Sequence, residues 1–225
     1  MTDRRMLLLG LAPALLTAAA LTACSGEDGK EVGAVEDLMR EHGVLRRIIL
    51  ALRESGSRLA ASNTLPSQPL AEAIRLFQKF GEDYHEKKLE EAHIFPAVRK
   101  AGGPAAAMID TLLAQHQRGR DLTAYMLNVA SKGIGRGDVA GLSSAFDSFE
   151  LMYANHTARE DTLIFPAWKS ALSDSEIDEM GEQFEDIEKQ EFGTDGFDYA
   201  VKTVDHVEQE LGLSDLAQFT APEPR

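Results

Sequence analysis

Histidine and glutamate side chains occur twice in one short pattern that is suited to binding a metal ion. The segment HTAREDTLIFPAW at 156–168 places His156 four residues before Glu160, and the segment HEKKLEEAHIFPA at 85–97 ends in the same Ile-Phe-Pro-Ala. Residues four positions apart project from one face of a helix. Imidazole and carboxylate groups are common ligands of iron and related metals. The two copies therefore predict a duplicated metal site.

The repeat extends to further positions along the chain. Three pairs of residues recur with offsets between 70 and 74 residues: Glu90 and Glu160, His85 and His156, and His42 and His116. The chain then reads as two helical hairpins, each with one histidine on its first helix and a histidine and a glutamate on its second. If the hairpins pack with pseudo-twofold symmetry, four imidazoles and two carboxylates meet in the interior. That ligand set suits a pair of iron ions.

The two copies differ in one spacing, because His85 and Glu90 are five residues apart instead of four. At about 100° per residue, these side chains would point roughly 140° apart in a straight α-helix. A π-bulge between them would absorb the extra residue, and we favour this solution. Two alternatives stay open: Glu86 could replace or join Glu90, and His93 could contribute from the same side of the helix. Since the second copy has Leu163 at the position of His93, we expect His93 to line a pocket or the surface rather than bind metal.

Apolar residues recur at intervals of three and four along most of the chain, which is typical of amphipathic helices. The pattern predicts four long helices at about 34–62, 70–100, 105–131 and 139–172, separated by the breaks NTLPSQP, AGGP and KGIGRGD. Strand signals are nearly absent. Four long helices with short connections predict an all-α fold, an antiparallel four-helix bundle over residues 34–172. Pro96 and Pro166 are expected to bend or end their helices just beyond the site.

Residues 173–225 form an acidic extension that we expect to be helical and to pack on the bundle. Its phenylalanines and Tyr199 provide apolar contacts, and Ser173 followed by Glu176 matches a capping box at the start of a helix. Acid-rich helical stretches are usually solvated faces, and His206 is expected to face solvent. The acidic surface could also contact a partner protein.

The N-terminus has the pattern of an export signal. Residues 1–23 combine two arginines with an apolar run, and that run is shorter than the roughly 20 residues needed to span a bilayer, so a cleaved signal peptide is expected. The tetrapeptide LTAC resembles the lipobox of bacterial lipoproteins, which implies a lipid on Cys24. The segment SGEDGKEVG that follows is typical of a flexible tether, so 24–33 is expected to join the lipid to the domain. The segment TDRRMLLL also resembles a twin-arginine signal. We therefore expect an exported, membrane-anchored lipoprotein that faces the periplasm or the cell exterior.

Charge and cysteine content exclude several classes of function. The chain carries a net charge of −14, which disfavours binding to nucleic acid. Its single cysteine is Cys24, so disulfides, thiol catalysis and cysteine-ligated zinc or iron-sulfur sites are excluded. Any metal must be held by histidine and carboxylate.

The spacing of these ligand candidates and the two Phe-Pro signatures resemble the hemerythrin-like, or HHE cation-binding, domain over about residues 34–170. The resemblance implies a hemerythrin-like four-helix bundle with two iron ions bridged by carboxylates and an oxo or hydroxo group. The matching positions are His42, His85, Glu90, His116, His156 and Glu160. Other divalent metals could also occupy such a site.

Members of this family bind O2, store or sense iron, or respond to O2, nitric oxide or peroxide. Oxygen-carrying members use five histidines and two carboxylates, whereas four histidines match here. This count favours redox chemistry or metal handling over reversible carriage. The first hypothesis is an exported di-iron protein that binds or reduces a small oxidant near the membrane. The alternative is a non-catalytic module that binds iron, or senses iron or oxygen, and acts through a protein partner.

Overall fold

The computed structural model describes residues 32–62 and 66–224 of the chain. The predicted signal peptide at 1–23, Cys24 and most of the tether at 24–33 lie outside the described residues. Within the described part every regular element is a helix and none is a strand, so the predicted all-α fold is confirmed. No helix of this part combines the length and apolar character that crossing a membrane requires.

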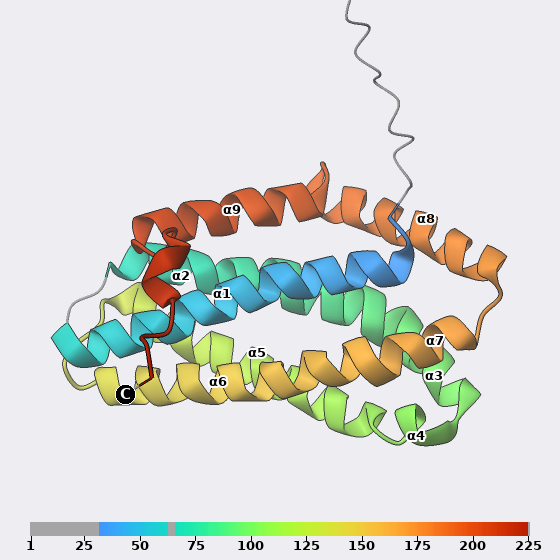
Figure 1. Ribbon diagram of the computed structural model, residues 1–225, viewed down its shortest axis with the longest axis horizontal. Helices are drawn as coiled ribbons and strands as arrows, with labels where there is room; N and C mark the ends of the chain where they lie inside the picture. Colours follow the sequence, from blue (N-terminus) through green and yellow to red (C-terminus); the bar gives the residue numbers. More distant parts are fainter. Residues whose placement is uncertain (1–31, 63–65, 225) are drawn as a thin grey trace, which may run out of the picture. The chain divides into compact units, whose positions relative to one another are not determined.

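Four long helical rods form the bundle, and they run alternately up and down (Figure 1). The first rod is α1 (Ala34–Ser62), and the second joins α2 (Ser67–Leu76), the π-helix η1 (Phe77–Ile94) and α3 (Phe95–Ala101). The third consists of the short α4 (Gly103–Ala106) and α5 (Ile109–Lys132). The fourth joins α6 (Val139–Arg159), the π-helix η2 (Glu160–Ile164) and α7 (Phe165–Ser170). Helix α1 packs against α6, and α2 packs against α5.

Two of the predicted helices differ in detail from the structure. The third was expected to be continuous over 105–131, but a tight turn closed by the bond from Met108 N to Ala105 O separates α4 from α5. Gly102 and Gly103 before it have φ values of 78° and 80°, which glycine adopts readily because it lacks a Cβ. The second was expected over about 70–100, and it begins three residues earlier, at Ser67, and continues past Pro96 to Ala101 as three segments.

Wide helical turns explain how both rods pass their prolines. The amide of Phe95 donates to the carbonyl of Glu90, and the amide of Phe165 donates to that of Glu160, each five residues back. The proline that follows each phenylalanine lies in the first turn of a new α-helical segment, where its missing N–H matters least. We expected a single π-bulge between His85 and Glu90, whereas the π-helix covers 18 residues there and a second one lies at Glu160–Ile164.

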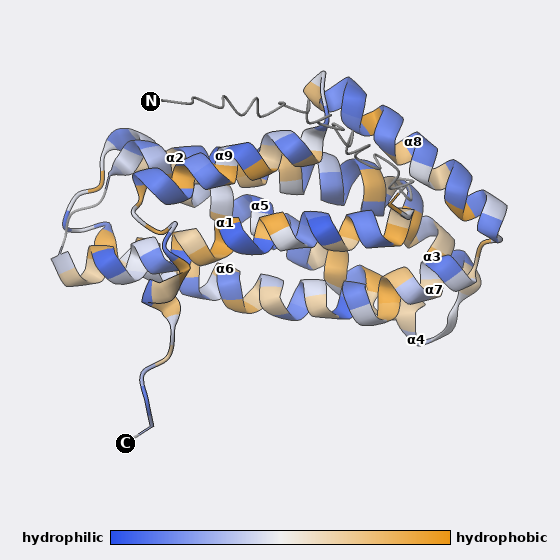
Figure 2. Cartoon of the chain, turned by 45° about the horizontal axis from the view of Figure 1, so that its top comes forward, coloured by the Kyte–Doolittle hydropathy of each residue, from blue (hydrophilic) through white to orange (hydrophobic). Residues whose placement is uncertain are grey.

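Two further helices and a short 3₁₀ turn follow the bundle. Helices α8 (Asp174–Phe192) and α9 (Gly196–Glu210) lie against α1 and the second rod, and η3 (Leu216–Phe219) comes after them. The predicted capping box of Ser173 and Glu176 is present at the start of α8. Hydrophilic residues predominate along both helices (Figure 2).

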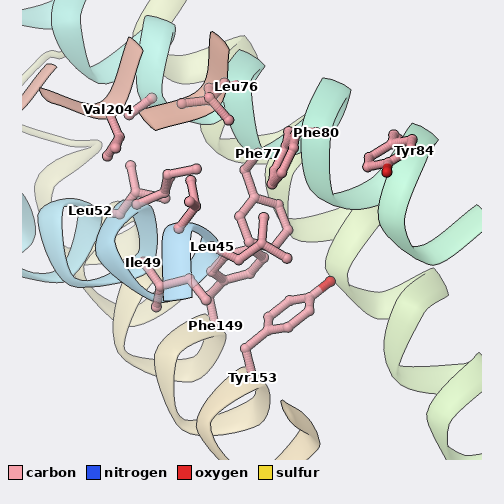
Figure 3. Packing of buried hydrophobic residues seen from close by; sticks show 14 of the residues in the cluster. Leu45, Ile49, Leu52, Leu76, Phe77, Phe80, Tyr84, Phe149, Tyr153 and Val204 are labelled. Atoms are coloured by element: carbon pink, nitrogen blue, oxygen red, sulfur yellow. The ribbon is translucent and has the colours of Figure 1, made fainter. Parts of the chain in front are cut away.

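The apolar core fills the space between the four rods and α9. Leu45, Ile49 and Leu52 of α1 meet the aromatic rings of the second and fourth rods, and Val204 of α9 approaches from another side (Figure 3). Phe77 packs edge-on against Phe149, with 4.8 Å between the ring centroids. This close packing of aromatic rings holds the second and fourth rods in register, which fixes the positions of the polar residues beyond it.

Candidate metal centre

Each long rod brings at least one of the predicted ligand residues into the interior. The six residues expected from the sequence are all between 0% and 2% exposed: His42, His85, Glu90, His116, His156 and Glu160. Carboxylates are almost never fully buried unless they are paired or bind a metal, and a buried imidazole needs a hydrogen-bond partner or a metal. The structure therefore gathers into one buried cluster all of the residues predicted from the repeat.

The four histidines form two pairs, and within each pair the two Nε2 atoms approach each other. His42 Nε2 lies 3.0 Å from His85 Nε2, and His116 Nε2 lies 3.1 Å from His156 Nε2. Each pair joins one histidine from the first helix of a hairpin with the histidine of its second helix. The two hairpins thus place their histidine pairs in equivalent ways, as the symmetry expected from the sequence requires.

The two glutamates lie between the histidine pairs. Glu90 Oε1 is 3.5 Å from His85 Nε2, and Glu90 Oε2 is 3.3 Å from His116 Nε2. Glu160 Oε2 is 3.6 Å from His42 Nε2, whereas Glu160 Oε1 is 3.0 Å from His156 Nε2. Each carboxylate therefore directs one oxygen towards each pair, as a group that bridges two cations would.

The carboxylate oxygens of Glu90 and Glu160 fit a metal better than they fit a protein core. All four are fully buried, and although imidazole nitrogens lie near them, none receives a well-directed hydrogen bond. A buried carboxylate without partners is costly, and native proteins rarely retain one. The ligand atoms of Glu90, His116, His156 and Glu160 lie within 4.8 Å of one another, and so do those of His42, His85 and Glu90.

His42 and His116 lie on the first helix of their hairpins and are called the first-helix histidines. Each is oriented by an acid that was not predicted from the sequence. His42 Nδ1 contacts Asp161 Oδ1 at 2.7 Å, and His116 Nδ1 contacts Glu91 Oε1 at 2.9 Å. Asp161 and Glu91 each follow directly after a glutamate of the repeat, with the same offset of 70 residues. That recurrence was the signal in the sequence that could have found them.

His85 and His156, the second-helix histidines of the two hairpins, also have partners at Nδ1. His85 Nδ1 lies 2.5 Å from Glu41 Oε2, and Glu41 Oε1 accepts a hydrogen bond of 2.9 Å from the hydroxyl of Tyr84. His156 Nδ1 lies 3.0 Å from Gln115 Oε1. Because every Nδ1 faces an oxygen acceptor, each ring can carry its proton there and present the lone pair of Nε2 to the interior. Two lone pairs that face each other at about 3 Å favour a cation or a proton between them.

Phenylalanines of the repeated Ile-Phe-Pro-Ala segments stack on the first-helix histidines. Phe165 lies against His42 with 5.3 Å between ring centroids, and Phe95 lies against His116 at 5.5 Å. Each ring crosses from one hairpin to the other, so it limits the rotation of the imidazole. The repeated segment thus supports the histidine geometry.

Glu86 and His93, the two alternatives considered for the second rod, do not lie between the histidine pairs. The carboxylate of Glu86 accepts hydrogen bonds from Tyr153 at 2.6 Å and Arg120 at 3.1 Å, on the Nδ1 side of His116. His93 is half-buried and packs against Phe184 with 5.7 Å between ring centroids. His206 is exposed, as expected.

The pKa values of the two central carboxyl groups are driven apart. Burial and the neighbouring Glu90 raise the pKa of Glu160 well above its usual range. Burial opposes ionisation of Glu90 as well, but the imidazoles of His85 and His116 outweigh it and hold its pKa well below the usual range. Two carboxyl groups this close share one proton unless cations compensate their charge.

The same buried charges shift the pKa values of the imidazoles. Burial disfavours the charged form of His116, but Glu86, Glu90 and Glu91 outweigh it and raise its pKa to about 10. His85 behaves alike, since Glu90 and Glu41 raise its pKa well above the usual range against the effect of burial. Burial and the nearby His116 lower the pKa of His156 to about 4. The cluster thus attracts positive charge, and a metal ion would replace these protons.

Comparison with known proteins agrees with this arrangement. The family model described as hemerythrin HHE cation binding domain matches residues 33–168, and matches again over 107–210. The uncharacterized proteins Rv1995 of Mycobacterium tuberculosis and Mb2018 of Mycobacterium bovis are each 41% identical to the chain over 217 residues, covering 89% of this chain and 84% of theirs. No solved structure matches the chain. The buried histidines and glutamates are consistent with a metal site of this type.

Proposed function

This chain belongs to the hemerythrin HHE cation-binding family, and on that premise we propose that it is a non-haem di-iron protein that binds or reduces a small oxidant. The oxidants that suit this proposal are O2, peroxide and nitric oxide. Two iron ions would supply electrons to such a molecule and bind it. The chain itself supplies the ligands, the orientation of the ligands and the exclusion of water.

One observation carries the proposal. The four oxygens of Glu90 and Glu160 are buried without hydrogen-bond partners, and each carboxylate faces both histidine pairs. A purely structural core would gain by replacing such groups with apolar residues. Two cations, one at each histidine pair, would satisfy all four oxygens and the four imidazole lone pairs together.

The residues divide into two proposed iron positions. His42 and His85 would hold one ion, and His116 and His156 would hold the other. Glu90 and Glu160 would bridge them. Asp161 and Glu91 keep the proton of their histidines on Nδ1, and the stacked phenylalanines hold the rings in place. The histidine and glutamate side chains of the site are at most 2% exposed. A small oxidant that enters the site would therefore meet little bulk water.

The proposed place of action is outside the cytoplasm at a membrane. It rests on the signal-like segment at 1–23 and on Cys24 within LTAC. Twin-arginine export would suit a protein that acquires iron before translocation. The lipid-modified protein should stay with the membranes until detergent releases it. The Cys24→Ala variant should no longer associate with membranes. Both results would support the anchor.

Metal content and the visible spectrum test the central proposal. Protein isolated from its native compartment should contain about two irons per chain, and His156→Ala and Glu160→Ala should lose iron and the visible absorption. His206→Ala is the matched control, since His206 is an exposed histidine outside the cluster. Absence of bound metal in the unmodified chain would contradict the proposal.

Oxidant consumption separates the proposal from its alternative. The reduced iron-loaded protein should be oxidised by O2, peroxide or nitric oxide and should turn over when reductant is supplied. Iron binding without any turnover would favour a non-catalytic iron-binding or sensing module. For such a module, the acid-rich exposed side of α8 is the candidate surface for a protein partner.

A further inference from the structure

We propose that the two metal positions are inequivalent, and that Glu41 makes the His42–His85 position the one that fills first and binds metal more tightly. This inference rests on the proposed function, because it assumes that the cluster binds two cations. It goes beyond that function by assigning an order of loading and by naming Glu41 and Gln115 as the residues that set it.

Glu41 and Gln115 are the point at which two otherwise repeated positions differ. Glu41 precedes His42 directly, and Gln115 precedes His116 directly, so the two residues are equivalent in the repeat. Each reaches across its own hairpin to Nδ1 of the second-helix histidine, Glu41 to His85 at 2.5 Å and Gln115 to His156 at 3.0 Å. The contact is therefore conserved between the halves, while the acceptor changes from a carboxylate to a neutral amide.

A carboxylate and an amide affect a ligating imidazole differently. An anionic acceptor at Nδ1 draws the proton towards itself, which makes Nε2 a stronger electron donor. A neutral amide oxygen fixes the ring in the same orientation but polarises it less. Burial strengthens the effect in the first half, because Glu41 is 1% exposed whereas Gln115 is half-buried. His85 is therefore the better donor of the two.

The remaining Nδ1 contacts do not cancel this difference. His42 and His116 both face carboxylates, from Asp161 and Glu91, at 2.7 and 2.9 Å. An arginine accompanies each acid, Arg46 at 3.7 Å and Arg120 at 2.6 Å. These first-helix contacts are alike in type in the two halves, so the contrast comes from the second-helix histidines.

Glu86 is a further carboxylate near the His116–His156 position, and it makes no hydrogen bond to either histidine. Its nearest imidazole nitrogen is His116 Nδ1 at 4.0 Å, which is beyond hydrogen-bond distance. Its oxygens are engaged by Tyr153 and by Arg120, whose guanidinium compensates the charge. Glu86 therefore acts on His116 only through space, as one of the charges that raise its pKa, whereas Glu41 bonds directly to Nδ1 of His85.

Metal titration of the apo full-length chain tests the inference. Co²⁺ is the probe, because its visible spectrum reports the binding of each ion, and the titration is done without O2. The wild type should bind two ions in two resolved steps, separated by roughly 10- to 100-fold in affinity, the usual effect of an outer partner on a metal site. Crystals loaded with one equivalent should show anomalous scattering at the His42–His85 position.

Three variants separate charge from packing. Glu41→Gln should weaken the first step by roughly tenfold or more and bring the two steps together. Gln115→Glu should strengthen the second step and also bring the steps together. The exchange Glu41→Gln with Gln115→Glu should separate the steps again and move the first ion to the His116–His156 position. Tyr84→Phe is the matched control, since it removes a neighbour of Glu41 but keeps the carboxylate, and the order should persist.

The outcomes distinguish this inference from the proposed function. Two ions that bind with no more than the statistical difference of identical sites, or a first ion at the His116–His156 position, would overturn the inference while leaving the di-metal proposal intact. Failure of the wild type to bind Co²⁺ or Fe²⁺ would overturn both. If Glu41→Gln does not fold, Gln115→Glu and the anomalous scattering of the wild type still decide the order.

Discussion

The two hairpins of the bundle share the residues that face the interior and differ in those one layer further out. Both contribute a histidine pair, a glutamate, an acid directly after that glutamate and a phenylalanine that stacks on a histidine of the other hairpin. They differ at Glu41 and Gln115, and in the length of their π-helices. The repeat thus preserves the buried histidines and glutamates, while the residues that contact them differ between the two halves.

The largest expected effect comes from a residue that both halves share. Glu90→Ala removes the two oxygens that face both histidine pairs, so binding of both metal ions should be strongly impaired. His85→Ala removes a ligand from one position only and should leave about one ion bound per chain. Metal analysis after gel filtration measures both. Equal losses in the two variants would contradict the assignment of Glu90 as a bridge.

A glycine present in only one half should also have a large effect. Gly119 corresponds to Leu45 in the other hairpin, and a Cβ at Gly119 would come within 2.1 Å of the hydroxyl of Tyr153. Gly119→Ala should therefore lower the free energy of unfolding by about 1 to 3 kcal/mol, because overpacking forces neighbouring groups to move. Urea denaturation measures this. Adding Tyr153→Phe should restore part of the loss, and no restoration would exclude the hydroxyl as the cause.

The paired outer acids should behave alike. Asp161→Asn and Glu91→Gln each remove a carboxylate from Nδ1 of a first-helix histidine. Each should weaken metal binding at its own position by about tenfold, or about 1.4 kcal/mol. Isothermal titration with Zn²⁺ in each variant measures the change. An effect at one position and none at the other would show that the two halves differ in this contact too.

The smallest expected effect lies outside the bundle, at the junction of α8 and α9. Glu188 accepts a hydrogen bond of 2.8 Å from the amide of Phe197, and burial, Asp195 and Glu41 raise its pKa to about 7 against the effect of backbone donors. A carboxyl group whose pKa is raised in the folded protein binds protons more tightly there, so its contribution favours folding at low pH. That contribution declines as the pH rises from about 4.5 to about 7.

Hydrogen exchange of α9 measures this dependence. Between pH 5 and pH 8, protection of α9 should fall by about 1 kcal/mol more in the wild type than in Glu188→Gln, after correction for the intrinsic exchange rate. The variant replaces the titrating carboxyl with an amide of similar shape, so its protection should depend less on pH. Equal dependence in the two proteins would assign the effect to other groups.

The ligand candidates and the helices could be read from the sequence because both leave periodic signals. The repeat at an offset of 70 residues identified Glu90 and Glu160, and the spacing of apolar residues placed the four long helices within a few positions of their observed ends. The outer acids Asp161 and Glu91 shared the same offset, so they could have been found. Glu41 and Gln115 carried no such signal, because the repeat matches their positions but not their residue types.

The recurrence of residue types and their helical spacing were visible in the sequence, and they were enough to predict a helical fold. The tertiary structure decided which nitrogen of each histidine faces the interior, that Glu86 turns away towards Tyr153 and Arg120, and that wide helical turns carry Glu90 and Glu160 inward. The reason is physical. Periodicity specifies the direction of a side chain around its own helix, whereas hydrogen-bond partners come from other helices and exist only after the rods have packed.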